Sequence, residues 1–460
     1  MSLKRLDATS RRGRRAIERL LERGGDRLDR KLARVQRKAR RIADAVRTGG
    51  DRALLRAVDR YDGVPARRVA ELRRRPARVP SQDLPPGFER AIERALRAIE
   101  RFHRTQHDNG PRGFELGPDG LGDDPGGARI VERCEPLRRV CLYVPGGRFP
   151  YPSTVAMSVI PARLAGVKEI VVATPPRAFE TSPALRHTLA LLEVDEVWAM
   201  GGAHAIAAMA YGTETIAAVE MIAGPGNAYV SAAKQAVAGR VGIDQDAGPS
   251  EVVILASADA GEEAVPWIAA DLLAQAEHDP RAVVVAITPD RKLLRAIAAE
   301  VDHQLRGLPT AETARAALAG ASCSLLVEDL EAGLALAERL APEHIQLVGR
   351  AAEELAPRVR CAGAVFVGAA TPTAFGDYLA GPSHVLPTGG TARFASGLST
   401  SDFVRRWHVV RYDAAAAAAA AADVANLARA EGLFGHAASA ERRAFPSSGP
   451  DPREKREDRS

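Results

Sequence analysis

Residues 251–288 read EVVILASADAGEEAVPWIAADLLAQAEHDPRAVVVAIT and contain the pattern that decides the fold. Two short apolar runs, Val252–Ala256 and Ala282–Ile287, stand on either side of a longer helix-favouring stretch, Glu262–His278. Continuous apolar strands that alternate with helices are typical of parallel sheets buried on both faces. The stretch therefore predicts a strand–helix–strand unit of an α/β protein.

The same alternation extends along the chain in two series. The first series comprises the candidate strands Val140–Val144, Glu169–Ala173, Glu196–Met200 and Val219–Ala223. The second continues the quoted stretch with Ser324–Val327, Ile345–Val348 and Ala364–Val367. Helical stretches such as Val155–Ala165 and Arg291–Gln304 separate most of them. We therefore expect two α/β domains, at residues 130–245 and 246–395.

The segments outside these domains have a different character. Residues 1–110 favour helices, at Val35–Val46 and again at Phe88–Gln106, and Gly49–Gly50 breaks the first of them. Residues 109–127 are rich in Gly, Pro and Asp and predict a loop. Within residues 396–445, nine consecutive alanines (Ala414–Ala422) predict a helix. Residues 446–460 contain little that could be buried and predict a disordered tail.

The composition indicates the cellular compartment of the protein. The chain has 460 residues, of which 46% are hydrophobic and 27% charged, as in ordinary folded domains. No apolar run is long enough for a membrane span, and Met1–Arg15 lacks the apolar core of a secretory signal. The four cysteines form no CxxC pair, which argues against a disulfide framework or a cysteine zinc cluster. We therefore expect a cytoplasmic protein with no membrane partner.

The positive charge is confined to one segment. Residues 1–50 carry 17 Lys and Arg against 6 Asp and Glu, whereas the whole chain has a net charge of +6. The rest of the chain therefore has a net charge of about −5. Only 5% of the residues are aromatic, which leaves few rings to stack on bases. This distribution favours a solvated, arginine-rich helix over a nucleic-acid partner.

Two short stretches contain histidine beside another polar ligand. In DLLAQAEHD (271–279), Gln275 and His278 are three residues apart near a helix end, so they share a face and could hold a metal ion together. The alternative is a histidine that interacts with the last carbonyl groups of the helix. In APEHIQL (341–347), Glu343 and His344 could activate water and carry protons. The alternative is an exposed glutamate beside a hydrogen-bonded histidine.

Two later stretches add further candidates. GDYLAGPSHVLPTGGTAR (376–393) contains Asp377, a possible oxygen ligand, and His384, although this stretch alone favours an aspartate that caps a turn. EGLFGHAAS (431–439) contains Glu431 and His436, and the latter could be an ordinary surface or core histidine. If the segments met, Gln275, His278, Asp377 and His436 would supply two nitrogen and two oxygen ligands. That mixture suits Zn²⁺ or a similar divalent ion.

Two glycine-rich turns lead from candidate strands into helices. YVPGGRFPYPSTVAM (143–157) offers Ser153 and Thr154 as helix N-caps. IAGPGNAYVSAAK (222–234) resembles GxGxxG but has Tyr229 where the third glycine belongs, so it fails as a dinucleotide fingerprint. It still predicts a helix N-terminus that faces an anion or a carbonyl group.

Taken in order, these segments resemble the histidinol dehydrogenase family over about residues 46–440. The matching stretches begin with VRTGGDRALLRAVDRYDG and continue with YVPGG, PSTVAM, GGAHAIAAMAYGT, IAGPGNAYV, AGPSE, DLLAQAEHD, PEH, GDYLAG, HVLPTGGTAR and EGLFGH. The resemblance implies two Rossmann-like parallel-sheet domains of aldehyde-dehydrogenase-like type, with helical N-terminal and C-terminal dimerisation segments. It also implies a zinc enzyme that oxidises L-histidinol to L-histidine through L-histidinal with two NAD⁺, in the last steps of histidine biosynthesis.

The resemblance assigns roles residue by residue. It implies one zinc ion per chain, bound by Gln275, His278, Asp377 and His436, and a homodimer in which His436 comes from the partner chain. Glu343 and His344 match the catalytic acid–base pair. The residues that match substrate-binding positions are Ser250, Gln275, His278, His344, Asp377, His384, Glu431 and His436. Those that match NAD-binding positions are Tyr143, His204 and Asn227.

This chain departs from the family pattern at three places. His204 stands where the family usually has glutamine, and an imidazole cannot reproduce both hydrogen bonds of an amide. Cys141 replaces a usual glycine, and polar Gln245 and Asp246 stand in a stretch that is often more apolar. Two other functions stay open: a sister dehydrogenase for another alcohol, and a non-catalytic relative that binds ligand and regulates.

Overall fold

The predicted strands form two separate sheets in the computed structural model. It describes residues 3–22, 25–106, 112–116, 127–146, 150–245 and 248–444, with the backbone alone for 25–30 and 112–116. Contacts divide the chain into two units: Met1–His107 with Leu137–Phe403, and Asp108–Pro136 with Val404–Ser460. The tail predicted at 446–460 and most of the loop predicted at 109–127 lie outside the described residues. The five-segment division made from the sequence stays a prediction.

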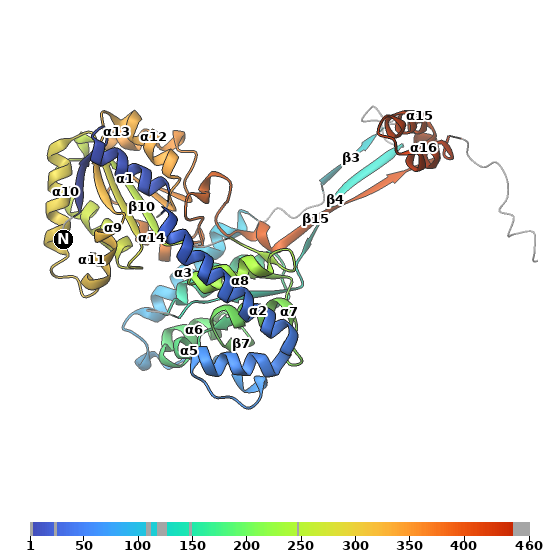
Figure 1. Ribbon diagram of the computed structural model, residues 1–460, viewed down its shortest axis with the longest axis horizontal. Helices are drawn as coiled ribbons and strands as arrows, with labels where there is room; N and C mark the ends of the chain where they lie inside the picture. The colour runs from blue at the N-terminus through green and yellow to red at the C-terminus, as the bar shows by residue number, and fades with distance from the viewer. Residues whose placement is uncertain are drawn as a thin grey trace, which may run out of the picture. The chain divides into compact units, whose positions relative to one another are not determined.

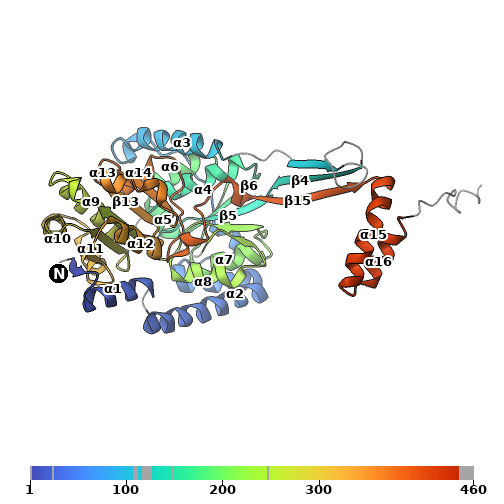
Figure 2. The same cartoon turned by 90° about the horizontal axis from the view of Figure 1, so that it is seen from above.

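The first sheet has six strands and is parallel except for its edge strand β2. Its strands, in spatial order, are β2 (Arg73–Arg74), β7 (Glu196–Ala199), β6 (Glu169–Thr174), β5 (Arg139–Tyr143), β8 (Met221–Ala223) and β9 (Gly242–Ile243). One face is covered by α2 (Gly25–Asp62), α7 (Gly202–Tyr211) and α8 (Ala228–Val237). On the other side lie α3 (Phe88–Arg104), α4 (Pro152–Leu164), α5 (Pro176–Thr181) and α6 (Pro183–Leu191), as Figure 2 shows.

The second sheet is parallel throughout. Its strands, in spatial order, are β1 (Lys4–Asp7), β12 (Cys323–Leu326), β11 (Val283–Thr288), β10 (Glu251–Ala256), β13 (His344–Val348) and β14 (Ala364–Val367). One face packs on α9 (Val265–Ala276), α10 (Arg291–Gln304) and α11 (Ala311–Ala319) (Figure 1). The opposite face packs on α1 (Arg11–Leu21), α12 (Leu330–Leu340) and α13 (Arg350–Glu353). Alternate strand residues supply the two cores, because successive side chains point to opposite faces.

Both sheets have the strand order of a nucleotide-binding fold. In the first sheet the chain moves outward from β5 through β6 to β7 and then returns to β8, on the other side of β5. In the second it moves from β10 through β11 to β12 and returns to β13. Such a reversal makes a topological switch point, where ligands bind in α/β proteins. The predicted fold class, two Rossmann-like parallel-sheet domains with helices toward both termini, is confirmed.

Shorter elements connect these layers. Helix α14 (Thr373–Tyr378) follows β14, and the 3₁₀ turns are η1 (Val69–Leu72), η2 (Ser81–Asp83), η3 (Ala258–Ala260), η4 (Ala356–Arg358), η5 (Thr391–Arg393) and η6 (Thr400–Phe403). Helix α4 begins at Pro152 with Tyr151 as its N-cap, so the predicted caps Ser153 and Thr154 are wrong. Proline is favoured in the first turn because its missing N–H is not needed there.

The second unit contains a sheet that the sequence did not predict. Strands β15 (Val404–Tyr412), β4 (Ala128–Pro136) and β3 (Arg112–Leu116) pair antiparallel in that order. The predicted alanine helix is confirmed as part of α15 (Ala414–Ala430). It packs against α16 (Phe434–Glu441) through small residues, among them Ala425, Ala428 and Ala437.

The four cysteines are all free. Cys141 and Cys323 are buried, and burial raises the pKa of each thiol to about 12. Cys141 faces the core beneath α7 and α8, where its side chain fills space in the packing. In the part of the chain that the structure describes, no helix has the length and apolar character needed to cross a membrane.

Candidate active site

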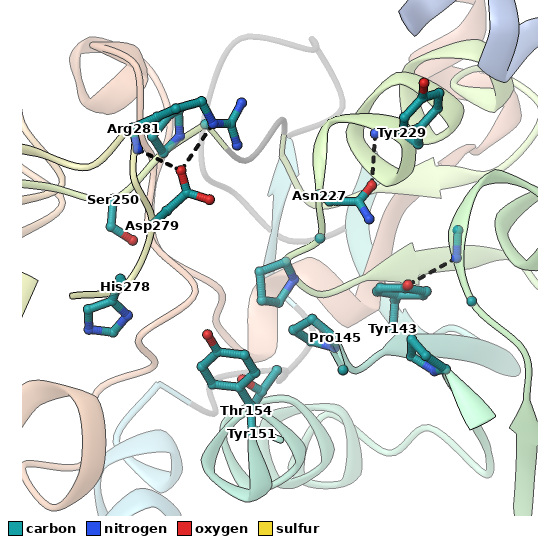
Figure 3. A pocket seen from close by; sticks show the side chains of 18 of the residues that line it. Tyr143, Pro145, Tyr151, Thr154, Asn227, Tyr229, Ser250, His278, Asp279 and Arg281 are labelled. Atoms are coloured by element: carbon teal, nitrogen blue, oxygen red, sulfur yellow. Dashed lines mark hydrogen bonds and ion pairs between the residues drawn. The ribbon is translucent and has the colours of Figure 1, made fainter. Parts of the chain in front are cut away.

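A cavity of about 650 Å³ lies within the first unit, and both sheets contribute to its lining. The carboxyl ends of β5 and β8 reach it from the first sheet, and the amino ends of β10 and β13 reach it from the second. Figure 3 shows Ser250 and His278 on one side and Tyr143, Asn227 and Tyr229 on the other. The predicted residues that line the cavity are Tyr143, His204, Asn227, Ser250, Gln275, His278, Glu343, His344, Asp377 and His384.

On the first-sheet side, Tyr143 and His204 are fixed by hydrogen bonds to their surroundings. Tyr143 ends β5, and its hydroxyl accepts a hydrogen bond of 3.1 Å from the N–H of Gly202. Burial raises the pKa of the Tyr143 hydroxyl, so it stays protonated. The His204 ring lies in the first turn of α7, with its Nε2 2.8 Å from Oδ2 of Asp62. The ring also stacks on Tyr61, with 5.9 Å between the centroids. The imidazole that replaces the usual glutamine is therefore held by helix α2.

The turn after β8 brings Asn227 to the cavity. Its side-chain oxygen accepts hydrogen bonds from the N–H groups of Tyr229 (2.9 Å) and Val230 (3.3 Å), which makes Asn227 the N-cap of α8. Gly224, at φ 112°, lies so close to the Tyr143 carbonyl group that a Cβ would overlap it. Only glycine accommodates both the positive φ and this contact.

A buried ion pair supports the same turn from behind. The Lys234 ammonium group pairs with Asp244 and donates a hydrogen bond of 3.0 Å to the Gly224 carbonyl oxygen. Asp244 in turn accepts a hydrogen bond of 2.7 Å from the Gly224 N–H. Gln245 follows with its side-chain oxygen buried and unpaired, for which we have no physical account, and Asp246 lies outside the described residues.

On the second-sheet side, Glu343 is a buried carboxyl at the amino end of β13. Its Oε2 accepts a hydrogen bond of 2.9 Å from the backbone N–H of Glu251, and the Ser250 side chain hydrogen-bonds to the same carboxyl. Burial raises the pKa of Glu343 well above its ordinary range, and the neighbouring charge of Asp377 acts in the same direction. The group can therefore hold a proton that a solvated glutamate would lose.

His344 is the next residue and is also buried. Its Nδ1 lies 3.1 Å from the Glu251 carbonyl oxygen and 3.6 Å from Oε2 of Glu343. A carbonyl oxygen only accepts, so Nδ1 carries the hydrogen and the lone pair of the neutral ring is on Nε2. Burial lowers the pKa of His344, an effect that the charge of Asp377 opposes. The ring is thus a neutral base at physiological pH.

Gln275, His278 and Asp377 approach the same part of the cavity from two other elements. Gln275 is buried in the last turn of α9, which ends at Ala276, so His278 lies in the turn beyond the helix and not on its face as predicted. The N–H of His278 bonds the Gln275 carbonyl oxygen at 3.4 Å, a tight turn that keeps the two residues together. Asp377 lies in α14, and its charge acts on the pKa of Glu343, His344 and His384.

His384 is held by two neighbours. Its Nδ1 donates to the Asp377 carbonyl oxygen at 3.0 Å, and its Nε2 accepts from the Thr154 hydroxyl at 3.1 Å. Burial lowers the pKa of His384, so the ring is neutral. His384 therefore lies beside Asp377 in the lining of the cavity.

A divalent ion fits these donors only if two conditions hold. Among the described residues, no group of three or more His, Cys, Asp and Glu side chains could hold a metal ion alone. The amide oxygen of Gln275 would therefore have to join His278 and Asp377, and a further donor would have to come from elsewhere. Glu431 and His436 belong to the second unit, are exposed, and do not line the cavity. This donor set, one short of four, is compatible with the predicted zinc site.

Several cavity residues escaped the sequence prediction. Lys38, Tyr61 and Asp62 come from helix α2, and Tyr151 and Thr154 come from the start of α4. Behind the cavity, Asp271 of α9 is buried next to Gln346 of β13. The RYDG and PSTVAM stretches contained three of these residues, Tyr61, Asp62 and Thr154, but a helical position gives no sign of a contact with a distant sheet.

Two nucleotide-binding-type sheets that meet at a cavity with a buried acid–base pair define an α/β enzyme of the dinucleotide-dependent class. The histidinol dehydrogenase family model matches residues 26–444. Histidinol dehydrogenase from Moorella thermoacetica is 45% identical over 413 residues, which cover 89% of this chain and 94% of that protein. The Thermus thermophilus histidinol dehydrogenase is 44% identical and covers 88% of this chain and 93% of its own length.

A solved structure gives the same result. The crystal structure of histidinol dehydrogenase from Elizabethkingia anophelis has a TM-score of 0.80 and 30% identity, and covers 96% of this chain and 98% of that one. The chain belongs to the histidinol dehydrogenase family of NAD-dependent oxidoreductases.

Proposed function

We propose that this enzyme oxidises L-histidinol to L-histidine through L-histidinal, with two NAD⁺ and one zinc ion per chain. One observation carries the proposal. A neutral imidazole with a free Nε2 and a buried carboxyl of raised pKa lie in one cavity with Gln275, His278 and Asp377. Alcohol oxidation needs a base for the hydroxyl proton, and aldehyde oxidation needs an activated water.

Zinc is proposed to be bound by Gln275, His278 and Asp377, with His436 of the partner subunit as the fourth ligand. When bound, it would orient the amino and imidazole nitrogens of the substrate as a Lewis acid, and NAD⁺ would accept the hydride in each oxidation. The donors of this chain fit such an ion because an amide, an imidazole and a carboxylate line one cavity. Ser250, His384 and Glu431 are proposed to contact the substrate.

In the first oxidation, His344 accepts the hydroxyl proton of the alcohol at Nε2. Its Nδ1–H stays bonded to the Glu251 carbonyl oxygen, so the ring cannot turn away. The carbon that carries this hydroxyl group loses a hydride, and the product is the aldehyde. Because the pKa of His344 is lowered by burial, the ring releases its proton again before the second step.

In the second oxidation, Glu343 removes a proton from water as the water oxygen bonds to the aldehyde carbon. The product is the anion of the hydrated aldehyde, because Glu343 keeps the proton, and this anion becomes the carboxylic acid when it loses a second hydride. The raised pKa of Glu343 makes it a stronger base than a solvated glutamate once it is ionised. The backbone N–H of Glu251 keeps the carboxyl in place throughout.

We infer a homodimer with shared active sites. Helices α15 and α16 and the turn between them, which contain Glu431 and His436, expose the large apolar side chains Val424, Leu427, Leu433 and Phe434. A second copy of the chain would bury these side chains, as dimer interfaces do. The four free cysteines fit a reducing compartment, which supports the cytoplasm as its location.

The test is the stoichiometry of NADH. With limiting L-histidinol and excess NAD⁺, the absorbance of NADH should correspond to two molecules per molecule of L-histidine formed. A yield of one, or turnover of other amino alcohols but not of L-histidinol, would favour a sister dehydrogenase. Binding of L-histidinol without any NADH would favour a regulatory relative.

A further inference from the structure

One end of the cavity has no role in the chemistry proposed above. Its lining comes from helix α2, through Lys38, Ile42 and Tyr61, and from helix α8, through Tyr229. It adjoins His204 and Asn227, which the family resemblance assigns to the cofactor. These residues could therefore contact a part of the cofactor that lies away from the reacting carbon.

Lys38 carries a charge that no carboxylate of the described residues neutralises. Its Nζ lies 5.3 Å from the centroid of Tyr61 and 5.2 Å from that of Tyr229, so the two rings hold the ammonium group by cation–π contacts. Among the residues that the structure describes, Lys38 makes no ion pair. Arg281, also in the lining, differs because its Nε and its backbone N–H both bond Asp279 (Figure 3).

Helix N-termini often bind phosphate, but those of α7 and α8, which lie beside His204 and Asn227 at the cavity, are already engaged. At α8, the Asn227 side chain accepts from the N–H groups of Tyr229 and Val230. At α7, the Gly201 N–H donates to Asp62 at 3.1 Å and the Gly202 N–H donates to Tyr143. The Asp62 carboxylate also repels a second anion at that end of α7. A diphosphate beside the N-termini of α7 and α8 would therefore need a side-chain cation.

We propose that Lys38 binds the diphosphate of NAD⁺ and that Tyr61 and Tyr229 hold its ammonium group at the cavity. The inference rests on the proposed function, because it requires an NAD cofactor in this cavity. The diphosphate is the anionic part of NAD⁺, and Lys38 is the cation of the lining that no described carboxylate pairs with. It also explains how the site can bind a dinucleotide although GPGNAY lacks the third glycine.

The experiment is isothermal titration of the zinc-loaded enzyme with NAD⁺, ADP-ribose and adenosine. Lys38→Met removes the charge and keeps much of the side-chain length, Lys38→Arg keeps the charge, and Lys31→Met removes a charge from the same helix outside the cavity. We expect Lys38→Met to lower the affinity for NAD⁺ and for ADP-ribose about tenfold, and to leave the affinity for adenosine unchanged. Lys38→Arg and Lys31→Met should stay within about threefold of the wild type.

The outcomes separate this inference from the function. If the wild type binds NAD⁺ and Lys38→Met binds it equally well, the diphosphate assignment is wrong and the proposed function stands. An equal loss of NAD⁺ affinity in Lys31→Met would also overturn the assignment, because the loss would then follow from the overall charge of the helix and not from the position of Lys38. If the wild type binds neither NAD⁺ nor ADP-ribose, both the diphosphate assignment and the proposed function are wrong.

Discussion

At the scale of single residues, Glu343 offers the clearest test of the acid–base chemistry. Glu343→Gln keeps the size of the side chain and an oxygen that accepts from the Glu251 N–H, but it removes the proton-carrying group. We expect kcat to fall at least about 100-fold, the usual effect of losing a general base. Thermal unfolding and the dissociation constant of L-histidinol should change little.

Glu354→Gln is the matched control for that variant. Glu354 is an exposed glutamate that pairs with Arg350 on the surface, far from any proposed chemistry. Its kcat should equal that of the wild type. Turnover of Glu343→Gln at the wild-type rate would remove Glu343 from the mechanism.

Asp271 is the second residue whose environment predicts a measurable effect. Burial raises the pKa of its carboxyl to about 6, and both its Oδ2 and the Oε1 of the neighbouring Gln346 are buried without a hydrogen-bond partner. Burial disfavours the ionised carboxyl more than Gln346 favours it, so the folded state favours the neutral form. Ionisation therefore costs stability as the pH rises from about 4 to about 6, and the cost stays constant above that.

Asp271→Asn should remove this cost, because the amide stays neutral and can donate to Gln346. Relative to the wild type, we expect its free energy of unfolding to increase by about 2 kcal/mol between pH 4.5 and 7.5, at 1.36 kcal/mol per pKa unit. Urea unfolding of the metal-free protein at both pH values measures this. The exposed Asp195→Asn serves as control, and a pH-independent difference for Asp271→Asn would contradict the assigned pKa.

At the scale of elements, Arg139 joins three strands of the first sheet. It is buried at the start of β5 and bonds Glu169 of β6 at 2.9 Å and Glu196 of β7 at 2.7 Å. Arg139→Met leaves the partly buried Glu196 without its cation and should lower the free energy of unfolding by about 3 kcal/mol. Adding Glu196→Gln should recover a large part of that loss, as measured by urea unfolding. No recovery would mean that packing of the arginine, and not its charge, carries the effect.

The same scale shows what the sequence could predict. Strands such as β10 are apolar after their first residue, so their existence and parallel pairing followed from composition. Strand β15 was not predicted because nearly all its side chains are exposed and several are charged, which leaves no alternation to detect. Strand β1 was missed because it is a short, charged strand at the sheet edge.

The candidate site, too, could be predicted only in part from local sequence. Local sequence suggested Gln275, His278, Glu343 and Asp377 one at a time, each with an ordinary structural alternative. Only the pairing of β10 with β13, and the return of α9 toward the amino ends of those strands, brings the residues to one cavity. Such convergence depends on contacts between distant segments, which spacing along the chain does not contain. The family resemblance supplied that information instead.

At the scale of the whole molecule, the proposed shared active site makes a prediction about mixtures of inactive variants. Glu343→Gln and His436→Ala should each abolish turnover when expressed alone. In a mixed dimer, the chain with His436→Ala keeps Glu343 and would receive His436 of the partner subunit, so one of its two sites is intact. Random pairing of equal amounts makes half of the dimers mixed, and about a quarter of the wild-type activity should return.

A second mixture controls for mere stabilisation of one chain by another. Glu343→Gln with His344→Asn places both defects on residues that line the cavity of their own chain, so no pairing restores a complete site. Activity should therefore return after co-refolding of the first mixture and stay absent in the second. Recovery in both would show that subunits complement each other by another route. If neither mixture recovered activity, His436 would act within its own chain. The fourth zinc ligand would then come from the same chain as the other three.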